Sequence, residues 1–156
     1  MRKQRLHVGD SVPDFTLSDQ DGQVVSLREL LATGCLVLYF YPKDDTPGCT
    51  VEARAFQDEH VEFVREGATV AGVSSDDVEC HQRFALKHTL PFRLLSDRGG
   101  ELRRRFGVPK TLGLIDGRAT YVIDSTGVIR HVFSSLLRAR KHVEEAIRIV
   151  RSLRVS

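Results

Sequence analysis

The segment from Cys35 to Tyr41 constrains the fold of this chain more than any other. It reads Cys-Leu-Val-Leu-Tyr-Phe-Tyr, which is continuously apolar and rich in residues that favour strands. A strand with apolar residues at every position is buried on both faces and belongs in the middle of a sheet. Pro42 ends the run, because proline lacks the N–H group that a central strand needs. The chain is therefore expected to fold around a central sheet covered on both sides.

Strands and helices alternate along the rest of the chain. A hairpin of short strands is expected at 14–18 and 24–27 around the turn signal Asp21-Gly22, with further strands at 69–74, 92–95, 119–123 and 128–133. Helices are expected at 26–32, 49–66, 76–89, 101–106 and 138–153. This order predicts an α/β fold, a three-layer sandwich with a central mixed sheet and an N-terminal β-hairpin. It resembles the thioredoxin-like topology.

Composition limits the classes of protein that fit. The 156 residues, with no linker or repeat, predict a single domain spanning 1–156. A net charge of +2 argues against nucleic acid as the main partner, and no apolar run is long enough to cross a membrane. No secretory signal is recognisable, so we expect a cytoplasmic protein with reduced thiols. Three cysteines are too few for a disulfide-stapled scaffold.

The stretch from Tyr39 to Glu52, YFYPKDDTPGCTVE, carries the chemical signal. The central strand runs into a short loop, and Cys49 follows in the first turn of the next helix. Free N–H groups and the helix dipole favour the thiolate at such a position, and the thiolate is the nucleophilic form. The prolines of the loop stiffen it, and Gly48 permits close approach of a ligand. Cys35, inside the apolar strand, is expected to be inert.

The string YFYPKDDTPGCTVEA at 39–53 resembles the active-site signature of the peroxiredoxins, and most closely that of the bacterioferritin-comigratory-protein/PrxQ branch. The string GRATYVID at 117–124 is similar to the segment that carries the second catalytic residue of that family, an arginine. The resemblance extends over nearly the whole chain, from about Val8 to Leu153. The chain is accordingly identified as a member of this family.

The resemblance implies thiol-dependent reduction of hydrogen peroxide and organic hydroperoxides. Cys49 would attack the O–O bond and become a sulfenic acid. Arg118 would favour the thiolate and orient the peroxide, while Thr46 and the Cys49 backbone N–H would hydrogen-bond its oxygens. Pro42 would shield the pocket from water, and Glu52 would hold the arginine. No metal or other cofactor is implied. The implied reductant is thioredoxin, glutaredoxin or a small thiol, and a monomer is expected rather than a dimer.

The sequence departs from the family at the residue that resolves the sulfenic acid. Many members carry a second cysteine five residues after the first, where this chain has Arg54. Others carry it in the next helix, near the position aligned with Ala85. Cys80 lies about five residues earlier. Either Cys80 attacks oxidised Cys49 after local unfolding, or an external thiol resolves it directly.

Other functions of thioredoxin-like proteins fit this sequence less well than the peroxidase. A dithiol oxidoreductase needs Cys-x-x-Cys, which is absent, and the cysteine spacing also excludes a copper chaperone on a similar fold. A non-catalytic binding or redox-sensing module on a thioredoxin-like scaffold stays open as the alternative. Cys80, His81 and His88 fit no standard zinc spacing. The run Arg103–Arg105 is expected to be a solvated helix face.

Overall fold

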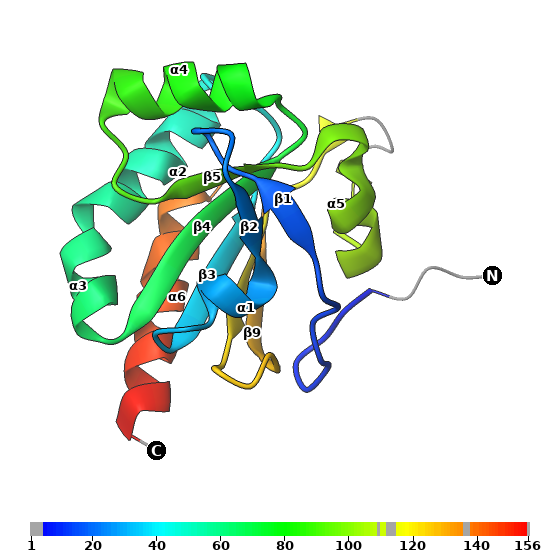
Figure 1. The fold of residues 1–156 in the computed structure, drawn as a ribbon. Coiled ribbons are helices and arrows are strands. Elements are labelled where there is room, and N and C mark those ends of the chain that lie inside the picture. The colour runs from blue at the N-terminus through cyan, green and yellow to red at the C-terminus, as the bar shows by residue number, and fades with distance from the viewer. Residues whose placement is uncertain (1–4, 109, 112–114, 136–137, 156) are drawn as a thin grey trace.

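The computed structural model describes residues 5–108, 110–111, 115–135 and 138–155. Its strands are β1 Thr16–Ser18, β2 Val24–Ser26, β3 Cys35–Phe40, β4 Ala68–Ser74, β5 Arg93–Ser96, β6 Lys110–Thr111, β7 Ile115–Asp116, β8 Ala119–Ile123 and β9 Ile129–Ser134. Its helices are α1 Leu27–Leu30, α2 Pro47–Asp58, α3 His60–Arg65, α4 Val78–His88, the 3-10 turn η1 Arg98–Gly100, α5 Glu101–Phe106 and α6 Ala139–Val155. Figure 1 shows the sheet between two layers of helices.

Seven strands form one mixed sheet in the order β2-β1-β5-β4-β3-β8-β9. β3 lies parallel to β4 and antiparallel to β8, so the apolar run is central, as predicted. Val37 is opposite Val70 on one side and Val122 on the other. One face of the sheet packs on α2, α3, α4 and α6, and the other on α1 and α5 (Figure 1). The predicted N-terminal hairpin and mixed sheet are confirmed.

Local signals in the sequence position the first helix correctly. Ser26 Oγ accepts the Glu29 N–H at 3.1 Å, and Glu29 Oε1 accepts the Ser26 N–H at 3.4 Å. These two bonds are a capping box, which satisfies donors that a helix start leaves unpaired. The helix then leads directly into β3, which carries the chain towards the site.

The helix expected over 49–66 is in fact two helices, so that prediction was wrong. Glu59, with φ −97° and ψ 4°, ends α2 and begins α3. The bend keeps both Phe56 and Phe63 fully buried, with ring centroids 5.9 Å apart. Residues seven apart share a face in a straight helix and in this bent pair alike, so their spacing carries no information about the bend.

The described strands other than β6 and β7 share one sheet. The single domain over 1–156 stays a prediction. Among the described residues, no helix combines the length and the apolar character that crossing a bilayer requires.

Candidate active site

Cys49 lies in the first turn of α2, where β3 delivers the chain after a short loop. Thr46 has the extended backbone of an N-cap, and Pro47 occupies the first helical position that proline favours. No side chain caps the start of α2, so its first N–H groups and the positive end of its dipole remain for a ligand. The Cys49 side chain is buried, with 2 % of its surface exposed. A reagent must therefore enter a pocket to reach the sulfur.

The structure brings Arg118 into contact with both Cys49 and Glu52. Arg118 comes from the turn before β8 and donates from Nη2 to Cys49 Sγ at 3.4 Å. Its Nη1 donates a hydrogen bond to Glu52 Oε1, and both side chains are buried. A Cβ on Gly48 would lie 3.1 Å from Arg118 Nη2, so glycine leaves room for the guanidinium against the helix. One arginine thus spans the sulfur and the carboxyl group.

Thr46 and Pro42 lie half-buried beside this group. The Thr46 hydroxyl donates to the Lys43 carbonyl at 2.9 Å, which uses its only proton. It therefore cannot donate to the Cys49 sulfur at the same time. Its oxygen lone pairs remain able to accept the O–H of a hydroperoxide.

Burial dominates the electrostatics behind the sulfur. It raises the pKa of Glu52 to about 8, although the Arg118 charge opposes the shift. It lowers the pKa of the neighbouring His142 to about 4. Burial also lowers the pKa of Arg118, but the negative charges of Glu52 and Cys49 outweigh it and raise that pKa. At neutral pH the arginine is therefore charged, the carboxyl largely protonated and the imidazole neutral.

Arg103 corrects the expectation of a solvated arginine face on α5. Its side chain is 3 % exposed and donates to the carbonyls of Tyr41 and Gly117, both at 2.7 Å. Tyr41 begins the active-site loop, and Gly117 precedes Arg118. Arg103 therefore ties together the two segments that carry the site. Three consecutive arginines look alike in sequence, and only the packing of α5 distinguishes the inward one.

Asp44 and His81 form a second network that the sequence did not reveal. Tyr41 OH donates to Asp44 Oδ1 at 2.5 Å, His81 Nδ1 lies 2.6 Å from Asp44 Oδ2, and His81 Nε2 lies 3.0 Å from the Leu95 carbonyl. With Asp76, these residues bring three metal-ligand atoms within 4.8 Å of one another. Hydrogen bonds already engage them: Asp76 Oδ2 accepts the Asp44 N–H at 2.8 Å. The network attaches the active-site loop to α4.

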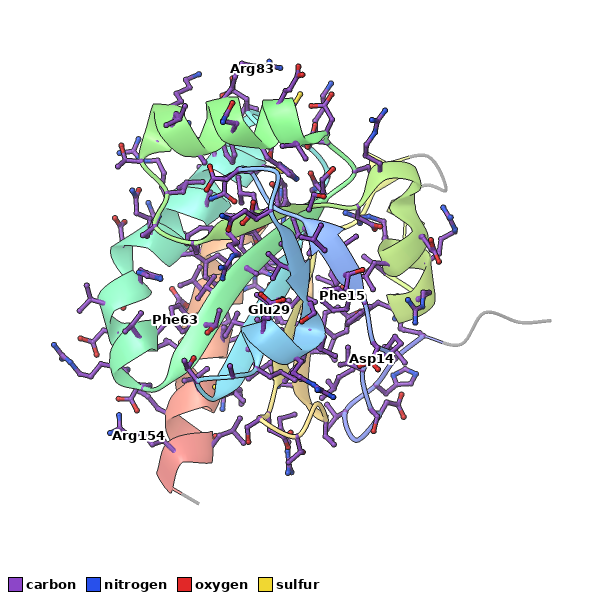
Figure 2. The ribbon with its side chains drawn as sticks, viewed as in Figure 1. Asp14, Phe15, Glu29, Phe63, Arg83 and Arg154 are labelled. Carbon is purple, nitrogen blue, oxygen red and sulfur yellow. The ribbon has the colours of Figure 1, made fainter. Side chains whose placement is uncertain are left out.

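Cys80 lies at the start of that helix, half-buried, and its thiol is free. Arg83 Nη2 contacts its sulfur at 3.2 Å, and Figure 2 shows Arg83 on the exposed side of α4. Burial and the Asp77 carboxylate raise the pKa of Cys80. Cys35 is also free, and burial raises its pKa as well. The arginine at Cys80 is exposed to solvent, whereas the arginine at Cys49 is buried.

A groove of about 600 Å³ opens beside the first turn of α2. Gly48 and Val51 line it from α2, and Arg138, Arg140 and Lys141 line it from the start of α6. Cations are mildly unfavourable at a helix start, so the stability of α6 does not account for this cluster.

Comparison with known proteins gives consistent matches. The family model described as "AhpC/TSA family" matches residues 8–132. Peroxiredoxin Q, chloroplastic, from Oryza sativa subsp. japonica is 45 % identical over 96 % of this chain and 69 % of its own length. The crystal structure of peroxidoxin BcpB from Mycobacterium tuberculosis has 38 % identity and a TM-score of 0.87, covering 94 % of this chain and 97 % of that one.

A structure of the Xanthomonas campestris bacterioferritin comigratory protein, whose title concerns its alkyl peroxide reduction activity, has 31 % identity and a TM-score of 0.80. It covers 90 % of this chain and 92 % of that one. These likenesses confirm the thioredoxin-like fold and the family that the two sequence motifs indicated.

Proposed function

Because the chain belongs to the AhpC/TSA family and is a thiol-dependent peroxidase of the peroxiredoxin Q type, we propose that Cys49 is its peroxidatic residue. The observation that carries the proposal is the contact of Arg118 Nη2 with the Cys49 sulfur at 3.4 Å, at an uncapped helix start. A charged donor and a helix dipole both stabilise a thiolate. Cys80 also has an arginine donor at a helix start, but that arginine is exposed, and Asp77 caps the helix and raises the pKa of Cys80. Cys35 lies in β3, away from any helix start.

The proposed reaction transfers one oxygen atom to sulfur. The Cys49 thiolate attacks the terminal oxygen of a hydroperoxide, and the S–O bond forms as the O–O bond breaks. Sulfur is oxidised to the sulfenic state while the peroxide is reduced to an alcohol, or to water from hydrogen peroxide. The leaving oxygen takes the peroxide proton. Thr46, the Cys49 N–H and Arg118 hold the peroxide in line, and Pro42 limits the entry of water.

Glu52 has a supporting role in this proposal. It accepts one N–H of Arg118, which fixes the guanidinium so that its other end reaches the sulfur. A non-catalytic module on a thioredoxin-like scaffold does not need this arrangement, so we set that alternative aside.

A single-cysteine series tests the assignment. We expect Cys49→Ser to abolish consumption of hydrogen peroxide in the presence of dithiothreitol, while Cys35→Ser keeps it, because the Cys35 thiol lies outside the pocket. Circular dichroism shows whether each variant is folded. Turnover by folded Cys49→Ser at the parent rate would refute the proposal.

Resolution follows one of the two routes left open by the sequence. In the first, Cys80 attacks the sulfenic acid, water leaves and a Cys49–Cys80 disulfide forms. In the second, an external thiol does the same and a mixed disulfide forms. We propose to map disulfides by mass spectrometry after one equivalent of peroxide. A Cys49–Cys80 peptide supports the first route, and its absence with full turnover of Cys80→Ser supports the second.

The partners are proposed at the same level. Thioredoxin, glutaredoxin or a small thiol is the proposed reductant, and the groove beside α2 is open to one. We propose a monomer, because the exposed large apolar side chains of the described residues are few and, apart from Val61 and Val64 on α3, lie on separate elements. A cytoplasmic location is also proposed, although the plant relative named above is chloroplastic.

A further inference from the structure

His142 is a buried side chain for which the reaction above has no role. It projects from α6 with no exposed surface, and its Nδ1 lies 3.6 Å from Glu52 Oε2. The Phe133 ring packs edge-on against it, with centroids 4.7 Å apart. Burying an imidazole costs free energy unless its nitrogens are satisfied. Its partners therefore show what the ring is arranged to do.

Two hydrogen bonds fix the tautomer and the orientation of the ring. Nε2 lies 2.8 Å from the Ser135 carbonyl, which can only accept, so Nε2 carries a proton. Nδ1 lies 2.7 Å from Thr120 Oγ1. In the neutral ring Nδ1 is an acceptor, and the Thr120 hydroxyl donates to it. A ring held at both nitrogens cannot rotate, so the Nδ1 edge, with its partial negative charge, has a fixed place.

The Glu52 carboxyl faces that edge. Glu52 Oε2 lies 3.6 Å from His142 Nδ1, too far for a hydrogen bond. It finds no hydrogen-bond partner among the residues that the structure describes. The partial negative charge of the acceptor nitrogen Nδ1 would repel an ionised Oε2, so this edge of the ring favours a proton on Oε2. Burial, which raises the pKa of Glu52 to about 8, acts in the same direction.

This arrangement determines which acceptors the Nη1 and Nη2 groups of Arg118 contact. A carboxylate with two free oxygens binds a guanidinium through both in a fork. Here only Oε1 receives Arg118, through Nη1, and Nη2 remains on the Cys49 sulfur. If the carboxyl rotated, or lost its proton, Oε2 would compete for Nη2. The thiolate would then lose its cationic partner.

We propose that His142 is a positioning residue for the peroxidase reaction: its fixed Nδ1 edge holds Glu52 in a one-oxygen contact with Arg118 and leaves Nη2 to Cys49. Thr120 and Ser135 are part of this support because they orient the ring. The inference rests on the proposed role of Cys49. It adds a residue of α6 to a site otherwise built from α2 and the segment before β8.

Other ionisable groups face this carboxyl. Tyr39 comes from β3, Cys49 from α2 and Arg118 from the turn before β8. Burial, followed by the charges of Glu52 and Cys49, raises the pKa of Tyr39 well above its usual value. Its hydroxyl therefore stays neutral over the range of the experiment below. The groups free to change the profile are Cys49 itself and the Glu52–His142 pair.

Two amide substitutions separate the two ring nitrogens. The amide of Asn reaches the place of Nδ1, and the amide of Gln reaches the place of Nε2. His142→Gln therefore keeps a donor for the Ser135 carbonyl and removes the edge that faces Glu52. His142→Asn keeps a polar atom at that edge and loses the Ser135 bond. Each variant loses one hydrogen bond of the ring, so their losses of stability are matched.

The measurement is the rate of alkylation of Cys49 by iodoacetamide as a function of pH, in a background with Cys35→Ser and Cys80→Ser. We expect the midpoint of the profile to rise by about one pH unit in His142→Gln, because the thiolate loses Arg118 Nη2. Since one unit is a factor of ten in the ionisation constant, oxidation of Cys49 by hydrogen peroxide should slow about tenfold at a pH well below the midpoint of the parent. His142→Asn should keep the midpoint of the parent.

Equal midpoints in His142→Gln and the parent, with both proteins folded, would overturn the proposal. Equal shifts in the Gln and Asn variants would also overturn it, because they would show a packing role alone. The alkylation profile does not depend on turnover, so it tests His142 even if Cys49→Ser shows that another group reduces the peroxide.

Discussion

Replacing Glu52 with glutamine tests whether a proton resides on this buried carboxyl. The folded protein raises the pKa of Glu52 from 4.5 to about 8, so it keeps a proton that the unfolded chain releases. This contribution to stability is complete below about pH 4.5 and is lost as the pH rises towards 8. Glutamine keeps the shape and the acceptor for Arg118 but does not titrate.

His142 adds an opposite dependence below neutral pH. Its pKa falls from 6.5 to about 4 on folding, so the unfolded chain binds a proton that the folded protein rejects. Stability is therefore lost as the pH falls from 6.5 to 4. Between about pH 4.5 and 6.5 the Glu52 and His142 contributions cancel. From pH 6.5 to 8 only the Glu52 contribution remains.

The size of the effect follows from that window. At 1.36 kcal/mol for each pH unit, the wild type should lose about 2 kcal/mol of unfolding free energy between pH 6.5 and 8. Glu52→Gln should not show this loss, although it should show the His142 dependence below pH 6.5. At pH 6 to 7 the variant should also retain peroxidase activity, because the amide oxygen still accepts Arg118.

Urea unfolding followed by circular dichroism gives the free energies at each pH, since the chain has no tryptophan to report by fluorescence. Glu62→Gln is the matched control. Glu62 pairs with Arg65 at 2.9 Å on the surface, where removing an ion pair changes little. If the wild type and Glu52→Gln lose stability equally between pH 6.5 and 8, the carboxyl holds no proton there, and the reasoning on Arg118 fails with it.

Three further substitutions probe the supports of the site. Arg103→Met should cost about 2–4 kcal/mol of unfolding free energy and lower peroxidase activity, since two buried carbonyls lose their charged donor. In the same urea unfolding experiment, the control Arg105→Met, at an exposed position, should change the free energy by no more than about 0.5 kcal/mol. His81→Leu removes the partner of Oδ2 in the buried Asp44 carboxylate. Amide exchange in α4, measured by mass spectrometry, should therefore accelerate at least about tenfold, while amide exchange in α6 should not change. Although burial opposes it, hydrogen bonding lowers the pKa of Asp124 to about 2, so the stability that this carboxylate provides is lost as the pH falls from about 4 through 2. Asp124→Asn should abolish that part of the acid dependence of the unfolding free energy. An unchanged dependence on pH below 4 would contradict this.

The fold was largely predictable because its main signals are local. The run from Cys35 to Tyr41 is apolar at every position, which predicts a buried strand. The spacing of apolar residues predicts the helices that follow it. The capping box at Ser26 and the turn at Asp21-Gly22 depend on neighbours along the chain. The bend at Glu59 was missed, because both aromatic residues around it face the sheet with or without the bend.

The candidate site was predictable only where a motif carries it. By itself the sequence determined the central strand, the cysteine at a helix start and, through resemblance, the arginine and the glutamate that meet it. These residues lie in short segments that can be recognised as motifs in the sequence.

Tertiary structure alone decided which of three adjacent arginines turns inward, and that His142 from the last helix lies beside Glu52. Arg103 is distant in sequence from Tyr41, and His142 from Glu52, and the neighbours of these residues along the chain give no sign of either contact. Burial on folding removes water from these groups, and that removal fixes their partners and shifts the pKa values of Glu52 and His142. A linear sequence specifies the groups; only the packed chain specifies the dielectric and the distances between them.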